Sequence, residues 1–310
     1  MEPTVALQGT RTTVLGVEIF HEELGQGPPL VLLHGLTDSH RTWRRVLPAL
    51  AKDRRVLVPD LPGCGFSSRP DASYTLAWQA AVMTAWLDKL GLEQVDVVGH
   101  SYGGGVAQYM LLLSPRRIRR LVLVAAGGLG REVSLELRLA SLPKVVERFG
   151  QPVMSRVAAH ALRAVGGVVT PDGARWMAGV SKTPGTARAF ARTVADVIDW
   201  RGQTQHFMDR AREIGVLPPV ALIWGTRDRV LPYAQALTAA RMLAGATLIA
   251  FDGCGHFPHH QRPREFARAV LSFMDASRAP TVSLETVTPV SVRSWFARIT
   301  HALFGAAVHA

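Results

Sequence analysis

The sequence predicts an α/β fold in which helices cover both faces of a mostly parallel β-sheet. The first observation is a set of short, continuous apolar runs at residues 30–33, 55–59, 121–125 and 218–224. Runs of this length and composition are typical of strands buried on both faces. The second observation is that segments compatible with helices alternate with these runs. Regular alternation of this kind implies right-handed crossovers and a parallel sheet.

Length and composition are those of a globular enzyme with a sizeable core. The chain has 310 residues, of which 48% are hydrophobic and 19% are charged, far from a disordered composition. No stretch of sequence approaches the ~18 consecutive apolar residues of a membrane span, and the first residues do not resemble a secretory signal. With only two cysteines, Cys64 and Cys254, a reduced chain is favoured over a disulfide. We therefore expect a cytoplasmic protein.

The chain is strongly basic, because 35 Lys and Arg against 24 Asp and Glu give a net charge of +11. Such a balance favours acidic partners, but the basic residues are spread along the chain. Two local clusters lie within residues 41–55 and at residues 116–120. Neither is interleaved with aromatic residues or accompanied by a nucleic-acid-binding motif, so we predict no nucleic-acid partner. The second cluster is expected to be a solvated loop.

In the first half of the chain, strands and helices alternate. Residues 11–24 alternate around a glycine turn as a hairpin does, and Gly91 is suited to end a helix. The predicted elements are a hairpin over 11–24, strands over 30–33, 55–59, 95–98 and 121–125, and helices over 42–52, 76–90 and 106–113. The motifs described below follow the carboxyl ends of predicted strands, where parallel sheets bind ligands.

The pattern changes between residues 131 and 216, where helical spacing with proline and glycine breaks replaces the strand-like runs. This segment is too long for one crossover connection, so we predict a helical cap over the catalytic edge. Its candidates for an apolar pocket are Met154, Trp176, Met177, Phe190, Trp200 and Phe207. The α/β pattern then resumes with strands over 218–224 and 246–251 and helices over 233–243 and 263–274.

These changes predict the domain organisation. Residues 1–130 form the first part of the α/β core, 131–216 the cap, 217–276 the second part of the core, and 277–310 a linker with a C-terminal helix. Residues 291–310 place apolar side chains on one helical face and basic side chains elsewhere. We expect this amphipathic helix to dock on its own domain or on another subunit, as in a homo-oligomer, rather than on a membrane surface.

The strongest motif is Gly-His-Ser-Tyr-Gly around Ser101, between a β-branched run and a helix-compatible segment. A serine at the apex of such a strand-turn-helix has strained backbone geometry, and glycines two residues to either side avoid side-chain clashes. The turn lifts the serine Oγ clear of the sheet and leaves the next amide facing an oxyanion. The context therefore predicts that Ser101 is a nucleophile.

A serine nucleophile needs a base, and the base works best when a carboxylate orients it. Asp228 and His256 each follow a predicted strand, in the chain order serine, acid, histidine that this turn type requires. The loop after the strand over 121–125 has no carboxylate that could compete. We therefore predict a Ser101, Asp228 and His256 triad, and expect His34 and His100 to hydrogen-bond locally and hold loops.

The oxyanion donors are predicted to be the amides of Tyr102, after the nucleophile, and of Leu36. His259 and His260 are expected on the surface or at the rim of the pocket. Together with His256 they are conceivable metal ligands, but no carboxylate or cysteine set completes a site at the usual spacing. Nothing in the sequence calls for a metal or an organic cofactor.

These motifs together resemble the α/β-hydrolase superfamily in its capped branch. The resemblance rests on residues 34–35, 60–67, 99–103, 225–228 and 253–256, and it covers about residues 11–276. It implies an eight-stranded, mostly parallel sheet with a lid after the sixth strand. By the same resemblance Ser101, Asp228 and His256 correspond to the family's triad, and Leu36 and Tyr102 supply the oxyanion amides.

Subfamily patterns bear on the reaction. Capped epoxide hydrolases and haloalkane dehalogenases use an aspartate nucleophile, which Ser101 argues against. Cofactor-free haloperoxidases share the Ser-Tyr-Gly-Gly-Gly run but usually lack so large a cap. Carbon–carbon hydrolases of ring-cleavage products are similar in layout. They usually carry asparagine before the serine and tryptophan after the histidine, where this chain has His100 and Phe257.

The expected activity is therefore hydrolysis of a carboxylic ester, lactone or thioester through an acyl-enzyme on Ser101. The expected substrate is a small molecule with a mostly apolar acyl group. One alternative is carbon–carbon bond hydrolysis of a ring-cleavage diketo acid. The other is a binding protein that keeps the fold without turnover, because fold alone does not determine function.

Overall fold

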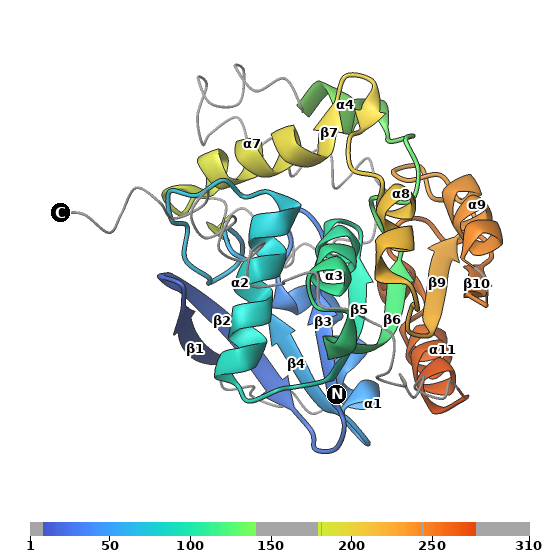
Figure 1. Cartoon of the computed structure of the whole chain (residues 1–310), viewed down its shortest axis with the longest axis horizontal. Helices are drawn as coiled ribbons and strands as arrows, with labels where there is room; N and C mark the ends of the chain where they lie inside the picture. The colour runs from blue at the N-terminus through green and yellow to red at the C-terminus, as the bar shows by residue number, and fades with distance from the viewer. Residues whose placement is uncertain (1–8, 141–178, 181, 244, 277–310) are drawn as a thin grey trace.

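One eight-stranded sheet, in the order β1-β2-β4-β3-β5-β6-β9-β10, forms the centre of the protein (Figure 1). A computed structural model describes residues 9–140, 179–180, 182–243 and 245–276. β2 pairs antiparallel with β1 and β4, and the other pairs are parallel. The mostly parallel, eight-stranded sheet expected from the sequence is confirmed.

The eight strands of the central sheet lie within three residues of their predicted bounds. They are β1 (Gly9–Val14), β2 (Val17–Leu24), β3 (Pro29–Leu33), β4 (Arg55–Pro59), β5 (Val95–His100), β6 (Ile118–Val124), β9 (Val220–Gly225) and β10 (Thr247–Phe251), with the two-residue β7 (Ile198–Asp199) and β8 (Gly202–Gln203). The α-helices are α1 (Leu47–Leu50), α2 (Leu76–Lys89), α3 (Tyr102–Leu113), α4 (Leu135–Ala140), α7 (Thr186–Val197), α8 (Phe207–Ala211), α9 (Ala234–Met242), α10 (Pro258–Gln261) and α11 (Pro263–Ala276). Short 3-10 turns are η1 (His40–Trp43), η2 (Pro115–Arg117) and η3 (Arg212–Ile214). Within the described residues, no helix has the length and hydropathy to cross a membrane.

Alternation along the strands divides the core into two layers. In β3, Val31 and Leu33 belong to the cluster packed against α2 and α3, whereas Leu30 and Leu32 belong to the cluster packed against α1 and α11. Successive strand residues point to opposite faces, so a run that is apolar at every position covers both. Figure 1 shows α2 and α3 on the near face of the sheet.

The single helix predicted over residues 42–52 is wrong. The structure has the 3-10 turn η1 followed by the one-turn helix α1, with Pro48 near the start of α1. Proline has no backbone N–H to give to the preceding turn, and its ring clashes with the carbonyl four residues before it. It can therefore begin a helix at this point, but it cannot continue one from residue 42.

The described parts of the segment between β6 and β9 include a hairpin that the sequence did not predict. β7 and β8 pair antiparallel, and the turn between them is held by two amides, of Arg201 and Gly202, that donate to Asp199 Oδ1. Gly202 has φ +131°, a backbone conformation that favours glycine. Figure 1 shows α4, β7 and α7 at the end of the molecule toward which β9 points.

The proposed pocket residues of this segment divide into two groups. Met154, Trp176 and Met177 lie outside the described residues, as do the linker and the tail over 277–310. Phe207 is buried in the core and Phe190 is packed against it, whereas Trp200 is 61% exposed. The structure thus gives Phe207 a packing role and leaves Trp200 at the surface.

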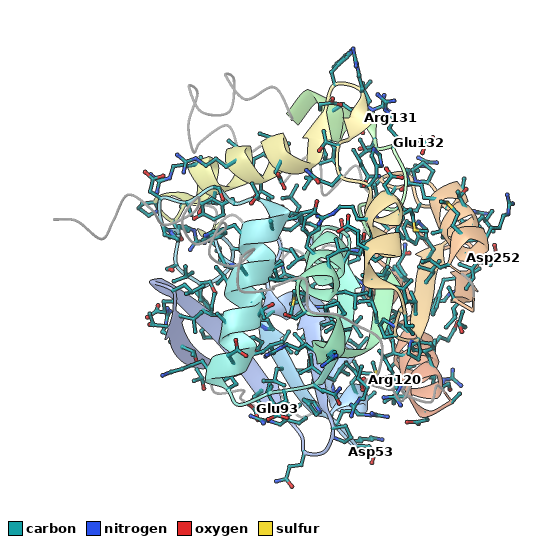
Figure 2. All side chains as sticks on the ribbon, in the orientation of Figure 1. Asp53, Glu93, Arg120, Arg131, Glu132 and Asp252 are labelled. Carbon is teal, nitrogen blue, oxygen red and sulfur yellow. The ribbon has the colours of Figure 1, made fainter. Side chains whose placement is uncertain are left out.

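The basic cluster at residues 116–120 is only partly a solvated loop, because Arg116 is exposed and Arg117 pairs with the exposed Asp88, whereas Arg119 and Arg120 surround a buried carboxylate. Asp96, in β5, is fully buried, and it contacts Arg119 at 2.8 Å, Arg120 at 3.3 Å and Arg54 at 3.5 Å. The hydrogen bond from the Arg119 guanidinium to Asp96 raises the pKa of that arginine. Figure 2 shows Arg120 at the end of the molecule opposite Arg131, so this cluster lies away from the predicted catalytic edge.

Replacing Asp96 with asparagine is expected to destabilise the fold. Breaking a buried ion pair typically costs about 3–5 kcal/mol. The three arginines keep 10–23% of their side chains exposed, so we expect Asp96→Asn to lower the free energy of unfolding by about 2–3 kcal/mol. Urea denaturation of wild type and Asp96→Asn measures this difference in the free energy of unfolding. Asp88→Asn, which removes an exposed partner of Arg117, should cost clearly less, and equal losses would contradict the role given to Asp96.

Candidate active site

Ser101 lies at the apex of the sharp turn between β5 and α3, with φ 52° and ψ −117°. The turn requires glycine at the flanking positions. A Cβ on Gly99 would lie 2.5 Å from the carbonyl oxygen of Gly103, and a Cβ on Gly103 would lie 2.5 Å from that of Leu33. The Ser101 amide donates to Val124 at 2.9 Å, so the turn is tied to the neighbouring strand β6.

Asp228 and His256 come together from the loops after β9 and β10. His256 Nδ1 is 2.8 Å from Asp228 Oδ2. The other carboxylate oxygen, Oδ1, accepts the amides of Val230 at 2.8 Å and Leu231 at 3.0 Å. Two backbone donors thus hold the carboxylate in one orientation. An ionised carboxylate only accepts hydrogen bonds, so His256 carries its proton on Nδ1 and has a free lone pair on Nε2.

The loop that holds His256 lies beside the turn that holds Ser101. His100, the residue before Ser101, has its Nε2 2.9 Å from the His256 carbonyl oxygen. The two imidazole rings lie 4.9 Å apart between centroids. The hydrogen-bonded pair of Asp228 and His256 therefore lies beside the residue that precedes Ser101, at the carboxyl edge of the parallel strands.

Backbone amides suited to an oxyanion lie at the same edge. Tyr102 is the first residue of α3, and first-turn amides have no partner within their own helix. His34 accepts the Leu61 amide at Nε2, so its Nδ1 carries the proton and donates to the Gly35 carbonyl at 2.8 Å. The Gly35 carbonyl and the Leu36 N–H belong to the same trans peptide, in which C=O and N–H point in opposite directions. The hydrogen bond from His34 to this carbonyl therefore also fixes the orientation of the Leu36 N–H.

The described part of the segment between β6 and β9 contacts this edge. Asp196 of α7 accepts the Leu76 amide at 2.8 Å, at the start of α2, and burial raises the pKa of the Asp196 carboxyl. Ala189, also on α7, lies so close to Gly63 that a Cβ there would be 2.8 Å from its methyl group. Helix α7 therefore packs against the loop after β4 and against the start of α2.

Gln203 is a positioning residue that sequence analysis missed. Its Oε1 accepts the Gly128 amide at 2.8 Å, and its Nε2 donates to Glu132 and Gln235. The adjacent Gly127 amide donates to the Ser101 carbonyl at 3.0 Å. Gln203 thus braces the loop that supports the serine. Its position in β8, 75 residues from Gly128, gives no local signal in the sequence.

The expectation that His259 lies at the surface or pocket rim is wrong. His259 is fully buried, with its ring 4.6 Å from Trp43 and 4.7 Å from His100. Its Nε2 is 3.1 Å from Thr42 Oγ1, which is also 2.7 Å from His260 Nε2. The side chain packs under the site because α10 turns it toward η1, a contact between residues 217 positions apart.

Several site groups are kept neutral by burial. Burial lowers the pKa of His100 and of His259 well below the usual value, with further lowering from the neighbouring histidines. Burial likewise raises the pKa of the Cys64 thiol to about 12, and both cysteines are free. Over the described ranges, no three His, Cys, Asp or Glu side chains converge in a group that could hold a metal ion.

Comparisons with known proteins bear on the family of this chain. A family model described as "alpha/beta hydrolase fold" matches residues 28–263. An uncharacterised protein of Mycobacterium tuberculosis is 38% identical over 276 residues, which are 86% of this chain and 80% of that protein. The 2-hydroxymuconate semialdehyde hydrolase of Pseudomonas sp. is 30% identical over 292 residues, which are 89% of this chain and 96% of that protein.

A similar solved structure is a meta-cleavage product hydrolase from Pseudomonas fluorescens, with a TM-score of 0.72 and 25% identity. The match covers 86% of this chain and 97% of that one. The agreement extends beyond the sheet, because nearly the whole of the solved chain is matched.

The buried histidines make the protein less stable in mild acid. Below about pH 6.5 the unfolded chain binds protons that folded His100 and His259 do not. The free energy of unfolding therefore decreases as the pH is lowered, by up to about 1.4 kcal/mol per pH unit for each such histidine. His259→Phe removes one of them, so its stability should fall less steeply between pH 6.5 and 5 in urea titrations. His206→Gln, at a site that is not buried, is the control, and identical slopes for wild type and His259→Phe would contradict this account.

Proposed function

The chain belongs to the α/β-hydrolase family and is a hydrolase. From that premise we propose that it breaks a carbon–carbon bond beside an aldehyde or ketone carbonyl in an unsaturated oxo acid. The observation that carries this proposal is the similarity to 2-hydroxymuconate semialdehyde hydrolase over 96% of that protein's length. A second relative is the 2-hydroxy-6-oxo-2,4-heptadienoate hydrolase of Pseudomonas putida, at 29% identity. This favours the alternative reading of the sequence over ester hydrolysis.

In this proposal Ser101 is the nucleophile, His256 the base and Asp228 the residue that orients the base. The support is geometric: Asp228 fixes the proton of His256 on Nδ1, which leaves Nε2 to take the proton of the Ser101 hydroxyl. The serine then adds to the aldehyde or ketone carbonyl. The amides of Leu36 and Tyr102 are proposed to bind the resulting oxyanion, a type of contact worth about 10²–10³ in rate for each donor.

Carbon–carbon cleavage places a demand on the substrate that ester cleavage does not. When the tetrahedral intermediate collapses, the departing group is a carbanion, which must be stabilised by conjugation with a carbonyl. The keto-dienoate named for the second relative has such a conjugated system. His256, which then carries the proton from Ser101, is placed to protonate the departing carbon, and this step leaves an acyl group on Ser101. A water molecule that gives its proton to His256 then attacks the acyl-enzyme, releases the carboxylic acid and restores the serine hydroxyl.

We further propose that residues 131–216 act as a cap that encloses the substrate. The support comes from the described part of this segment, where α7 bonds to the start of α2 through Asp196 and packs on Gly63. Enclosure excludes water from the oxyanion and strengthens its hydrogen bonds. A cap also selects the substrate, because its inner surface contacts the part of the molecule that does not react.

Ester hydrolysis is the second candidate, and one observation favours it. His100 and Phe257 occupy the two positions where carbon–carbon hydrolases of similar layout usually carry asparagine and tryptophan. The Phe257 ring packs edge-on against the His256 ring at 5.2 Å between centroids, and it lies tilted against the His100 ring at 4.9 Å. The aromatic ring that packs on His256 is therefore a phenylalanine, where those carbon–carbon hydrolases usually carry a tryptophan.

Parallel assays separate the two candidates. We expect 2-hydroxymuconate semialdehyde and 2-hydroxy-6-oxo-2,4-heptadienoate to be hydrolysed, which is followed by loss of the absorbance of the conjugated system. The p-nitrophenyl esters should react more slowly, by kcat/KM. The reverse order would favour ester hydrolysis. Ser101→Ala should abolish both activities and the mass increase that a fluorophosphonate gives to wild type, and retained turnover in that variant would contradict the nucleophile.

The acid is tested by Asp228→Asn. The backbone amides of Val230 and Leu231 would hold the amide oxygen of the asparagine at the Oδ1 position, so its NH2 group would face His256 Nδ1 and donate to it. The imidazole would then carry its proton on Nε2, the wrong tautomer, and kcat should fall on the order of 10⁴-fold. Asp252→Asn is the matched control, because Asp252 is an exposed carboxylate on the loop that also carries His256 (Figure 2). Its kcat should be unchanged. Equal kcat for wild type and Asp228→Asn would rule out Asp228 as the orienting acid.

A further inference from the structure

The His100 side chain lies between the loop that carries His256 and the loop that carries the Leu36 amide. It precedes Ser101 directly in the chain. Its Nε2 is 2.9 Å from the carbonyl oxygen of His256. On its other edge, a Cβ on Gly35 would lie 3.1 Å from Nδ1 and 3.4 Å from Cε1 of His100. One imidazole therefore spans from the loop of the base to the loop of the Leu36 amide.

The hydrogen bond to His256 determines the tautomer of His100. A carbonyl oxygen can only accept, so His100 Nε2 carries the proton and donates it. Nδ1 is then a lone pair, and it is buried with no hydrogen-bond partner among the residues that the structure describes. A proton on Nδ1 would be a buried donor without an acceptor, which is unfavourable. The ring is thus restricted to one neutral form, in one orientation.

The surroundings of His100 favour this neutral form. The side chain is only 1% exposed, and its ring is packed among aromatic neighbours: His256 and Phe257 at 4.9 Å, His259 at 4.7 Å and Trp43 at 6.4 Å. Burial, together with the nearby His256, His260 and His34, lowers the pKa of His100 well below its usual value. The imidazole therefore stays uncharged beside the base.

We propose that His100 is a positioning residue, whose Nε2–H holds the backbone of His256 against the strand that carries Ser101 while its opposite edge sets the spacing of the loop that carries the Leu36 amide. This inference rests on the roles proposed above for Ser101 and His256. It gives His100 no contact with the reacting atoms. It sets the distances from Ser101 to His256 and to the Leu36 amide, and a misplacement of about 1 Å in such a site can reduce the rate about 10²-fold.

Two substitutions separate the hydrogen bond from the packing. His100→Gln keeps an N–H at a similar reach from the backbone and removes the ring, whereas His100→Phe keeps a ring and removes both nitrogens. The measurement is the rate at which a fluorophosphonate modifies Ser101, by intact mass, at several reagent concentrations. This reaction needs the serine and its base but no knowledge of the substrate.

We expect His100→Phe to lower the maximal rate of modification at least about 30-fold, with the half-saturating reagent concentration unchanged, and His100→Gln to stay within about threefold of wild type. A role in stability alone would reduce the fraction of protein modified and leave the rate of the folded fraction unchanged. Equal rates for His100→Phe and wild type, or equal losses in both variants, would overturn the proposal. Absence of modification in wild type would instead refute the nucleophile itself, and the role of His100 with it.

A second measurement needs no variant. In ¹⁵N NMR of the wild-type imidazoles, His100 should be protonated at Nε2 and unprotonated at Nδ1 from pH 8 to pH 5. Fixed neutral tautomers of this kind are distinguished by the two nitrogen shifts. A proton on Nδ1, or titration of His100 within this range, would overturn the proposal even if His100→Phe failed to fold.

Discussion

The site depends on the backbone geometry of a single residue. Ser101 adopts φ 52° and ψ −117°, outside the regions that L-residues ordinarily occupy, and such strain persists only where the surroundings impose it. Here the strand before it, the helix after it and the amide bond to Val124 impose it. The close packing of Gly99 on Gly103, and of Gly103 on Leu33, leaves room for no other residue at the two glycines. The serine hydroxyl and the Tyr102 amide are set by this one turn.

Around that turn, the buried polar groups are oriented by backbone hydrogen bonds. Asp228 receives two amides, His34 is held between an amide and a carbonyl, and His100 donates to a carbonyl. In an interior of low dielectric, a buried polar group without a partner is costly, so each bond restricts a side chain to one tautomer and one direction. The arrangement is thereby preorganised, which is what electrostatic stabilisation of an oxyanion requires.

The two candidate reactions share most of this machinery. A nucleophile, a base and two oxyanion amides serve an ester and a ketone equally, because both pass through a tetrahedral intermediate. What separates them is the departing group, which leaves as a carbanion in carbon–carbon cleavage and as an alcohol or thiol in ester or thioester cleavage. For this reason the sequence motifs predict a serine hydrolase but do not identify the bond that it breaks, and an ester was the expected substrate. The proposal of carbon–carbon cleavage instead follows from the similarity to 2-hydroxymuconate semialdehyde hydrolase over 96% of that protein.

The sequence by itself determined the elements and the order of the site. Apolar runs predicted the parallel strands, glycine spacing predicted the turn at Ser101, and the chain order selected Asp228 and His256, because these patterns are local and strands of a parallel sheet end at one edge. Only the tertiary structure decided that Arg54, Arg119 and Arg120 surround Asp96 and that His259 is buried beneath the site. It also decided that the loop His100 bonds to is that of His256, and that Gln203 braces the loop after β6. Each of these contacts joins residues from about 20 to more than 200 positions apart. Which distant segments meet is set by how the sheet and the segments after β6 pack together, and no short stretch of sequence records that.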